Sequence, residues 1–310
     1  MNAPEAQRIT LKFDALTPAP GAMEVPVGVM LPRTYWQTVG VRLARDPYTA
    51  ACAFILLAIA GAAVLAPWLG LPDPAATNAA QRLLPVGSSG HLLGTDELGR
   101  DMLSRLIHGG RLSLTMGVLP VAVALAIGGT LGLVAGFIGG RTNMLVMRLT
   151  DVLYAFPSIL LAVAIAGSLG AGVGNALLAI TIVFIPPITR VTESVTTQVR
   201  AMDFVEAARA SGAGAFRIIR THILGNVMGP VFVYATVLVS VSILISAGLS
   251  FIGLGASPPT AEWGLMLNTL RESIFLAPLN AVLPGFMIFI TSMCFNLISD
   301  GLRSAMDVRL

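Results

Sequence analysis

The sequence predicts an all-α membrane protein with six transmembrane helices. Its residues are 55% hydrophobic and only 11% charged, whereas soluble domains carry about 25% charged residues. Five apolar runs contain no charged residue, and each is long enough for the roughly 20 residues that cross a bilayer core. The net charge is +3, but no stretch is densely basic with interleaved aromatic side chains. Membrane lipid is therefore an expected partner, and nucleic acid is not.

The apolar runs set the order of the spans along the chain. In sequence order they are residues 47–72, 112–140, 152–189, 223–261 and 273–299. The run 152–189 is too long for one crossing, and its glycine-rich stretch 167–175 predicts a tight turn between two spans. A tail of residues 1–46 precedes the first span, and its opening 30 residues lack the apolar core of a signal peptide. We expect this tail to be flexible and cytoplasmic.

The distribution of lysine and arginine predicts the orientation. With the N-terminus inside, the inner segments hold 14 of the 19 basic residues and the outer segments hold 5. Both termini are then cytoplasmic. Residues 73–111 form an outer loop, whose four arginines are balanced by four acidic residues. Residues 112–302 form a core domain with spans two to six and an inner loop at 190–226, and residues 303–310 form the cytoplasmic C-terminus.

The residues that are missing exclude several functions. The span bodies lack Asp, Glu, Lys, Arg and His, the side chains that ion-coupled transporters usually need, although a sodium site built from backbone carbonyls would escape this test. The three histidines lie apart in aqueous segments, so we predict no catalytic residue and no metal site. A phosphate-binding P-loop needs Gly-Lys-Ser/Thr, and the single lysine, Lys12, precedes Phe13. Any ATP that drives this protein must therefore bind to another chain. Cys52 and Cys294 are expected to be small apolar side chains facing lipid or the core.

A polar segment at 203–224, DFVEAARASGAGAFRIIRTHIL, lies between apolar runs. Asp203 and Glu206 have the spacing of an N-terminal capping box, and the alanines after them favour a helix. Gly212 and Gly214 predict a break, so we expect two short helices at an angle. Physical reasoning alone leaves two interpretations open, an interfacial loop whose arginines face lipid phosphates and a docking surface for another protein.

This segment resembles the EAA loop of ABC importer permeases, in the residues Glu206-Ala207-Ala208, Gly212 and Ile223-Leu224. The resemblance implies that the loop is a coupling helix that docks on an ATP-binding subunit. Gly225 stands where the family commonly has proline, so we expect the second helix to end less sharply. The residues expected to couple to the ATPase are Asp203, Glu206, Ala207, Ala208, Arg209, Gly212, Phe216 and Arg217.

Three other stretches resemble the C-type permeases of peptide and nickel importers. They are HLLGTDELGRD at 91–101 with its continuation to 114, LSFIGLG at 249–255 with PP and EWG after it, and FNL with DGLR at 295–303. The resemblance covers residues 36–310 and departs from the family at Ser304 and Val308. It implies an outer signature loop of Gly94, Thr95, Asp96, Gly99, Arg100, Asp101 and Arg105, and a C-terminal motif of Asn296, Asp300, Gly301 and Arg303.

The resemblance implies the function as well. A type I importer permease of the bacterial inner membrane would pair with a homologous second permease to enclose a pathway for di- or oligopeptides, with nickel chelates and glutathione-like peptides as alternatives. Two cytoplasmic subunits would bind ATP and Mg²⁺, an extracytoplasmic binding protein would deliver substrate, and this chain would bind no cofactor. The alternatives from other classes are an ion-coupled transporter or channel that acts without an ATPase, and a non-transporting scaffold.

Three local predictions follow from residue patterns. Thr95 or Asp96 would cap a helix over residues 97–105. There Asp96, Arg100, Asp101 and Arg105 either pair with one another or contact substrate, and the loop would then be a platform for the binding protein or a gate over the pathway. Trp263 is expected to be an interfacial membrane anchor. The serines of the fifth span either allow close helix packing or line a polar pathway; they are Ser240, Ser242, Ser246 and Ser250.

Overall fold

A computed structural model describes residues 35–306, and helices dominate this part of the chain. The long helices are α2 (Pro47–Leu65), α3 (Met102–Ile138), α6 (Val173–Arg200), α9 (Leu224–Phe251) and α11 (Pro278–Met306). The shorter ones are α1 (Tyr35–Arg45), α4 (Gly140–Tyr154), α5 (Ser158–Leu169), α7 (Asp203–Ala210), α8 (Ala215–Ile218) and α10 (Trp263–Leu270). Most of the predicted tail and residues 307–310 lie outside the described part.

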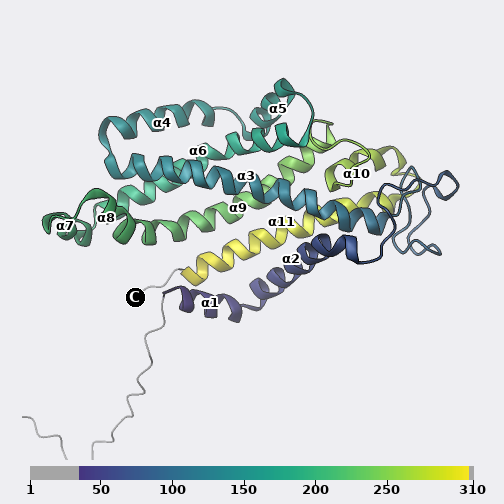
Figure 1. Cartoon of the computed structure of the whole chain (residues 1–310), viewed down its shortest axis with the longest axis horizontal. Helices are drawn as coiled ribbons and strands as arrows, with labels where there is room; N and C mark the ends of the chain where they lie inside the picture. Colours follow the sequence, from purple (N-terminus) through teal and green to yellow (C-terminus); the bar gives the residue numbers. More distant parts are fainter. Residues whose placement is uncertain (1–34, 307–310) are drawn as a thin grey trace, which may run out of the picture.

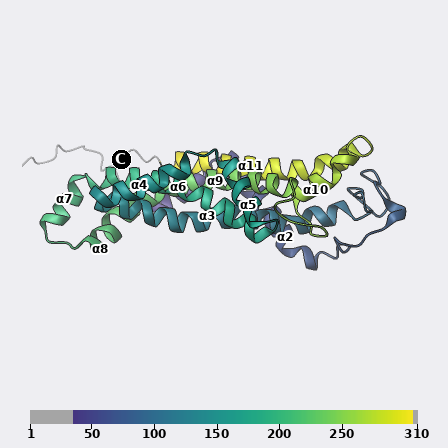
Figure 2. The ribbon, with the colours of Figure 1, turned by 90° about the horizontal axis from the view of Figure 1, so that it is seen from above.

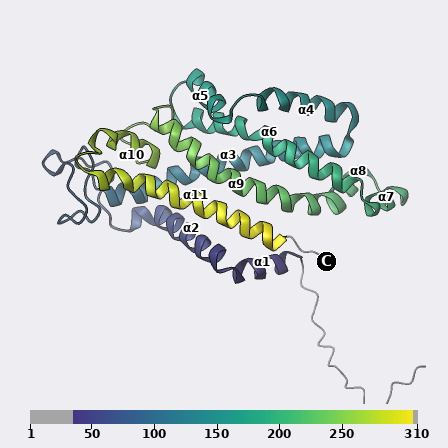
Figure 3. The ribbon, with the colours of Figure 1, turned by 180° about the vertical axis from the view of Figure 1, so that it is seen from behind.

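The long helices run side by side along the longest axis of a flat bundle (Figures 1 and 2). One end, which we call the α7 end, carries α7, α8, α1 and the end of α11 (Figure 1). The opposite end, the loop end, carries α10 and the loop between α2 and α3 (Figures 1 and 3). The chain therefore separates its two polar motifs, the segment at 203–224 and the loop at 94–105, by the length of the bundle.

The third predicted span is not one helix. Within residues 35–306, five helices are long and apolar enough to cross a membrane, and α4 and α5 together pass the same test but bend by 84° at their junction. With 12 residues, α5 is about 18 Å long, less than the roughly 30 Å hydrocarbon core. Pro157 lies at the break because it cannot continue the ladder of helical hydrogen bonds. Six crossings result only if this bent pair counts as one span. The turn predicted at 167–175 is confirmed, since α5 ends at Leu169 and α6 begins at Val173.

The second span begins ten residues before the predicted residue 112. Asp101 caps α3, and its carboxylate accepts a hydrogen bond of 2.8 Å from the backbone N–H of Ser104. The helix predicted over 97–105 with Thr95 or Asp96 as its cap is therefore wrong. The physical reason is Gly99, whose φ of +75° belongs to a turn that reverses the chain before Asp101.

Glycines spaced four apart bring α3 and α6 into close contact. Gly128, Gly132 and Gly136 form one face of α3, and an added Cβ on Gly132 would lie 2.5 Å from the backbone oxygen of Thr189 on α6. On Gly136 the Cβ would lie 2.7 Å from the Cβ of Thr196. Small residues at this spacing let two helix backbones approach closely within a membrane.

The segment after Gly214 is continuous with the fifth span. Residues 215–251 form one helical segment, in which a π-helical turn at Ile219–Ile223 joins α8 to α9. The second short helix of the predicted pair is therefore the start of α9. Gly225 lies inside α9 rather than at a helix end, so the prediction that this helix ends near Gly225 is wrong. The four serines of α9 are all at most 2% exposed, and Ser242 donates a hydrogen bond to the backbone of Met116 on α3, as close packing predicts.

Helix α11 packs against α2 near the α7 end. An added Cβ on Gly301 would lie 2.0 Å from the hydroxyl oxygen of Thr49, so only glycine fits at this contact. Cys52 on α2 and Cys294 on α11 are buried, free thiols, as core-facing residues would be. Asp46 caps α2, and the hydrogen bond from the Thr49 hydroxyl lowers the pKa of that carboxyl.

Candidate functional site

Helix α7 begins without the predicted capping box. Met202 is the residue before its first turn and adopts the extended backbone of an N-cap, whereas Asp203 is already helical. Asp203 and Glu206 therefore lie in the first turn, where carboxylates interact favourably with the positive end of the helix dipole. Both side chains are exposed.

The end of α7 is a Schellman motif centred on Gly212. The Gly212 N–H donates to the Arg209 carbonyl at 2.9 Å, and the Ala213 N–H donates to the Ala208 carbonyl at 3.1 Å. Gly212 has φ +78°, a conformation that costs an L-residue about 1–2 kcal/mol. The predicted break is therefore confirmed, and its geometry depends on glycine at position 212 and not at Gly214, whose φ is −68°.

A small apolar cluster fixes α7 to the bundle. Val205 of α7 is fully buried and packs in one cluster with Val199, Ile218, Ile223 and Val227 from α6, α8, the π-helical turn and α9. Ala208 is half-buried and packs against the same cluster, whereas Asp203, Phe204 and Glu206 are exposed. These contacts hold the helix in place and leave its polar side accessible.

The exposed side of this segment forms an open groove of about 600 Å³ between α7 on one side and α8 with the π-helical turn on the other. We call it the α7 surface. Its lining residues are Phe204, Ala207, Ala208, Ser211, Gly212, Ala213, Arg217, Thr221 and His222. Phe216 beside it is 76% exposed. Arg209 does not form the ion pair with Glu206 that their spacing allows; its guanidinium lies 5.7 Å from the centre of the Phe137 ring of α3.

At the loop end, Asp96 is the centre of a buried charge network. It is 2% exposed, and its carboxylate contacts the guanidinium of Arg100 at 2.6 Å and that of Arg105 at 3.3 Å. The predicted pairing within this motif is confirmed for these three residues. Asp101 differs, since it contacts His91 at 2.8 Å. Arg105 also donates from Nη1 to the Pro74 carbonyl at 2.9 Å, while its buried Nε–H has no hydrogen-bond acceptor among the described residues.

Glycines and an asparagine complete the signature loop. An added Cβ would lie 2.3 Å from the carbonyl oxygen of Leu84 at Gly94 and 1.9 Å from that of Asn78 at Gly99. Asn280 of α11 donates hydrogen bonds to the carbonyls of Leu84 and Thr95, at 2.9 and 2.8 Å. The loop is thereby attached to α11.

Trp263 is not a membrane anchor. It is fully buried, and its indole N–H donates to the Leu106 carbonyl of α3 at 2.9 Å. Glu262 beside it is also buried, caps α10, and accepts a hydrogen bond of 3.0 Å from Ser113. An amphipathic indole with a buried hydrogen-bond acceptor belongs in a protein core. Both residues join α10 to α3 beneath the signature loop.

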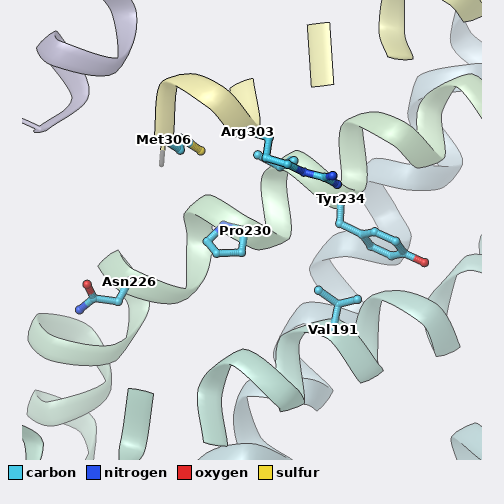
Figure 4. Close-up of a pocket in the computed structure, with 7 residues that line it drawn as sticks. Val191, Asn226, Pro230, Tyr234, Arg303 and Met306 are labelled. Carbon is cyan, nitrogen blue, oxygen red and sulfur yellow. The ribbon is translucent and has the colours of Figure 1, made fainter. Parts of the chain in front are cut away.

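The C-terminal motif spreads along the last turns of α11. Asn296 accepts a hydrogen bond of 3.1 Å from Ser240 of α9, and Gly301 packs on α2. Asp300 is exposed. The Arg303 side chain extends toward Tyr234 of α9, beside a pocket of about 510 Å³ at the α7 end (Figure 4). These residues serve three separate contacts and do not form one site.

Sequence reasoning missed the polar residues that join α6 to the α3–α4 turn. Arg200, Glu193 and Asn143 hydrogen-bond across these helices. Arg200 and Asn143 lie in the terminal turns of α6 and α4, Glu193 lies about two turns before the end of α6, and none of the three belongs to a motif. Sequence reasoning also missed the contact face of Gly128, Gly132 and Gly136 on α3, which we call the glycine seam. The sequence contained a signal for it, because three glycines four residues apart in one apolar run indicate a helix-packing face.

Comparisons with known proteins agree with this architecture. The family model for the "Binding-protein-dependent transport system inner membrane component" matches residues 128–310. The glutathione transport permease GsiD of Pectobacterium atrosepticum is 39% identical over 90% of this chain and 92% of its own. The di/tripeptide permease DppC of Pseudomonas aeruginosa is 45% identical, covering 82% and 86% of the two chains.

The dipeptide permease DppC of Alkalihalophilus pseudofirmus is 44% identical over 83% of each chain. Among solved structures, an inward-facing form of the MetNI methionine ABC transporter aligns with TM-score 0.55 and 17% identity, over 66% of this chain and 97% of that one. At that identity the likeness concerns the fold. The expected type I importer permease fold agrees with it. The chain belongs to the family of inner-membrane components of binding-protein-dependent transport systems and is a permease subunit of an ABC importer.

Proposed function

We propose that the chain carries short peptides across the inner membrane as one half of a translocation pathway, beside a homologous second permease. The relatives named for dipeptide, di/tripeptide and glutathione transport support this substrate class. Two separate subunits bind ATP and Mg²⁺ and supply the energy, and the chain itself performs no covalent chemistry. Neither the family nor these relatives supports the ion-coupled alternative.

The observation that carries the proposal is the α7 surface. It is an exposed helix and groove, fixed at Val205 and ended by the Gly212 turn, at the same end of the bundle as α1 and the end of α11. An ATP-binding subunit docks there, and closure of the two ATP-binding subunits moves α7. This orientation puts the α7 end in the cytoplasm, which the excess of inner arginines supports. The binding protein then delivers substrate at the loop end.

The test compares Gly212→Ala with Gly214→Ala. An alanine Cβ at either position meets no atom within 4 Å, but only position 212 has a positive φ. We expect Gly212→Ala to displace the end of α7, with a cost of about 1–2 kcal/mol, and to reduce both co-purification of the ATP-binding subunits and peptide uptake. Gly214→Ala keeps both.

Glu206→Ala extends the same test to the exposed face without backbone strain. We expect reduced ATPase co-purification with unchanged amounts of the chain in the membrane. Normal assembly and normal uptake in both Gly212→Ala and Glu206→Ala would refute the docking role. Solute flux by the chain reconstituted alone, driven by an ion gradient, would refute the ATP-driven importer.

A further inference from the structure

The end of α6 is hydrogen-bonded to the end of α3. Arg200, the last residue of α6, donates from Nη1 to the carbonyls of Gly136 and Phe137, at 3.1 and 2.9 Å. These carbonyls lie in the last turn of α3, where the helix provides no backbone N–H of its own to hydrogen-bond with them. Gly139 has φ +71°, and a Cβ there would lie 2.7 Å from Arg200 Nη1. The absence of a side chain at Gly139 makes room for the guanidinium.

Two further contacts hold the same turn between α3 and α4. Asn143, in the first turn of α4, donates its amide to the carboxylate of Glu193 on α6. Arg209 of α7 lies over the ring of Phe137. The α3–α4 turn is thus attached to α6 through hydrogen bonds and to α7 through a cation–π contact.

Arg200 is placed so that it links these contacts to α7. Only Ala201 and Met202 separate it from α7, and the glycine seam holds α6 tightly on α3 before this point. A shift of α7 therefore moves the α3–α4 turn as well, unless the Arg200 hydrogen bonds break. The next element after that turn is α4, whose junction with α5 is bent by 84°.

We infer that Arg200 is a positioning residue that transmits movement of α7 to the α3–α4 turn, and so couples ATP-driven movement to the spans. The inference rests on the proposed function, because it takes α7 as the place where movement begins. A purely structural cap of α3 would stabilise the chain without affecting how much transport each ATP supports. The two roles are separable by experiment.

The experiment uses the assembled transporter in proteoliposomes, with Arg200→Met, Arg200→Lys and the control Arg148→Met. Arg148 is an exposed arginine of α4, at the same end of the bundle. We expect Arg200→Met to assemble and hydrolyse ATP, while peptide taken up per ATP hydrolysed falls about 5-fold or more. Arg200→Lys keeps the positive charge and a donor nitrogen but loses the planar guanidinium, so it gives an intermediate ratio, and Arg148→Met matches the wild type. If Arg200→Met does not accumulate in the membrane, peptide taken up per ATP hydrolysed is compared between the wild type, Arg200→Lys and Arg200→Gln instead.

A distance measurement provides the second readout. Spin labels at Gln198→Cys and Arg141→Cys, in a background with Cys52→Ala and Cys294→Ala, report the separation between the end of α6 and the start of α4. We expect one narrow distance distribution with and without ATP, which broadens when Arg200→Met is added. Wild-type uptake per ATP together with an unchanged distribution in Arg200→Met would overturn the inference. If the wild-type chain recruits no ATP-binding subunit, the proposed function fails, and the label distribution in the chain alone still decides whether Arg200 fixes the turn.

Discussion

Replacing Gly132 with alanine tests the glycine seam between α3 and α6. The added Cβ would lie 2.5 Å from the Thr189 carbonyl oxygen, 2.7 Å from the Thr192 Cβ and 2.9 Å from the Glu193 backbone N. Two of these atoms belong to the backbone of α6 and cannot move aside as a flexible side chain can. The helices must separate, and overpacking of this kind costs about 1–3 kcal/mol. We place Gly132→Ala near the upper end, at about 2–3 kcal/mol.

The matched control is Gly129→Ala, one turn away on the same helix. Its added Cβ would have a single neighbour, the Leu125 side chain at 3.9 Å, so it makes ordinary contact. In detergent or nanodiscs, we expect Gly132→Ala to lower the apparent melting temperature by roughly 4–8 °C, measured at one fixed scan rate because unfolding can be irreversible. Gly129→Ala should stay at or above the wild-type value. Equal melting temperatures for the two variants would refute the close approach of α3 and α6.

Two other predictions concern the loop end. Asp96→Asn removes the charge that two buried arginines share, so we expect the protein to lose about 3 kcal/mol of stability and to accumulate poorly in the membrane. The control Asp73→Asn, at an exposed position, should accumulate normally. Equal yields of the two variants on an immunoblot would contradict the buried network. Asn280→Leu removes the donor to two loop carbonyls, at a cost of about 1–2 kcal/mol of stability. We expect faster amide hydrogen exchange at residues 83–95. Unchanged exchange there would show that α11 does not hold the loop.

Sequence patterns predicted the parts of the fold that composition controls. Charge-free runs are unambiguous, so the apolar bodies of the long helices and the turn near Gly170 follow from the sequence, whereas the charged ends of α3 and α6 lie outside the runs. Helix α4 was missed because charge alone defined the runs, and Arg141, Arg148 and Asp151 place most of α4 between the runs 112–140 and 152–189. Pro157 marked the break, but proline is also common within membrane helices.

Local signals were weaker where two backbone conformations compete. Thr95, Asp96 and Asp101 are all acceptable N-caps by residue type. The choice of Asp101 depends on the left-handed turn at Gly99, which packs against the backbone of Asn78. At Gly225 the sequence predicted a helix end that the structure does not have. Glycine would weaken an isolated helix, but Gly225 lies inside a long helix that is supported by packing. Arg200 could not be identified from sequence because its partners are backbone carbonyls of a helix more than 60 residues away.

Cross-linking from the α7 surface tests the central proposal most directly. Ser211→Cys is introduced in the background without Cys52 and Cys294, and the chain is produced together with its ATP-binding subunits. The control is Leu92→Cys, at an exposed position of the loop end. A thiol-reactive photo-cross-linker should join position 211, and not position 92, to an ATP-binding subunit. Cross-linking of that subunit through position 92 and not through position 211 would contradict the account.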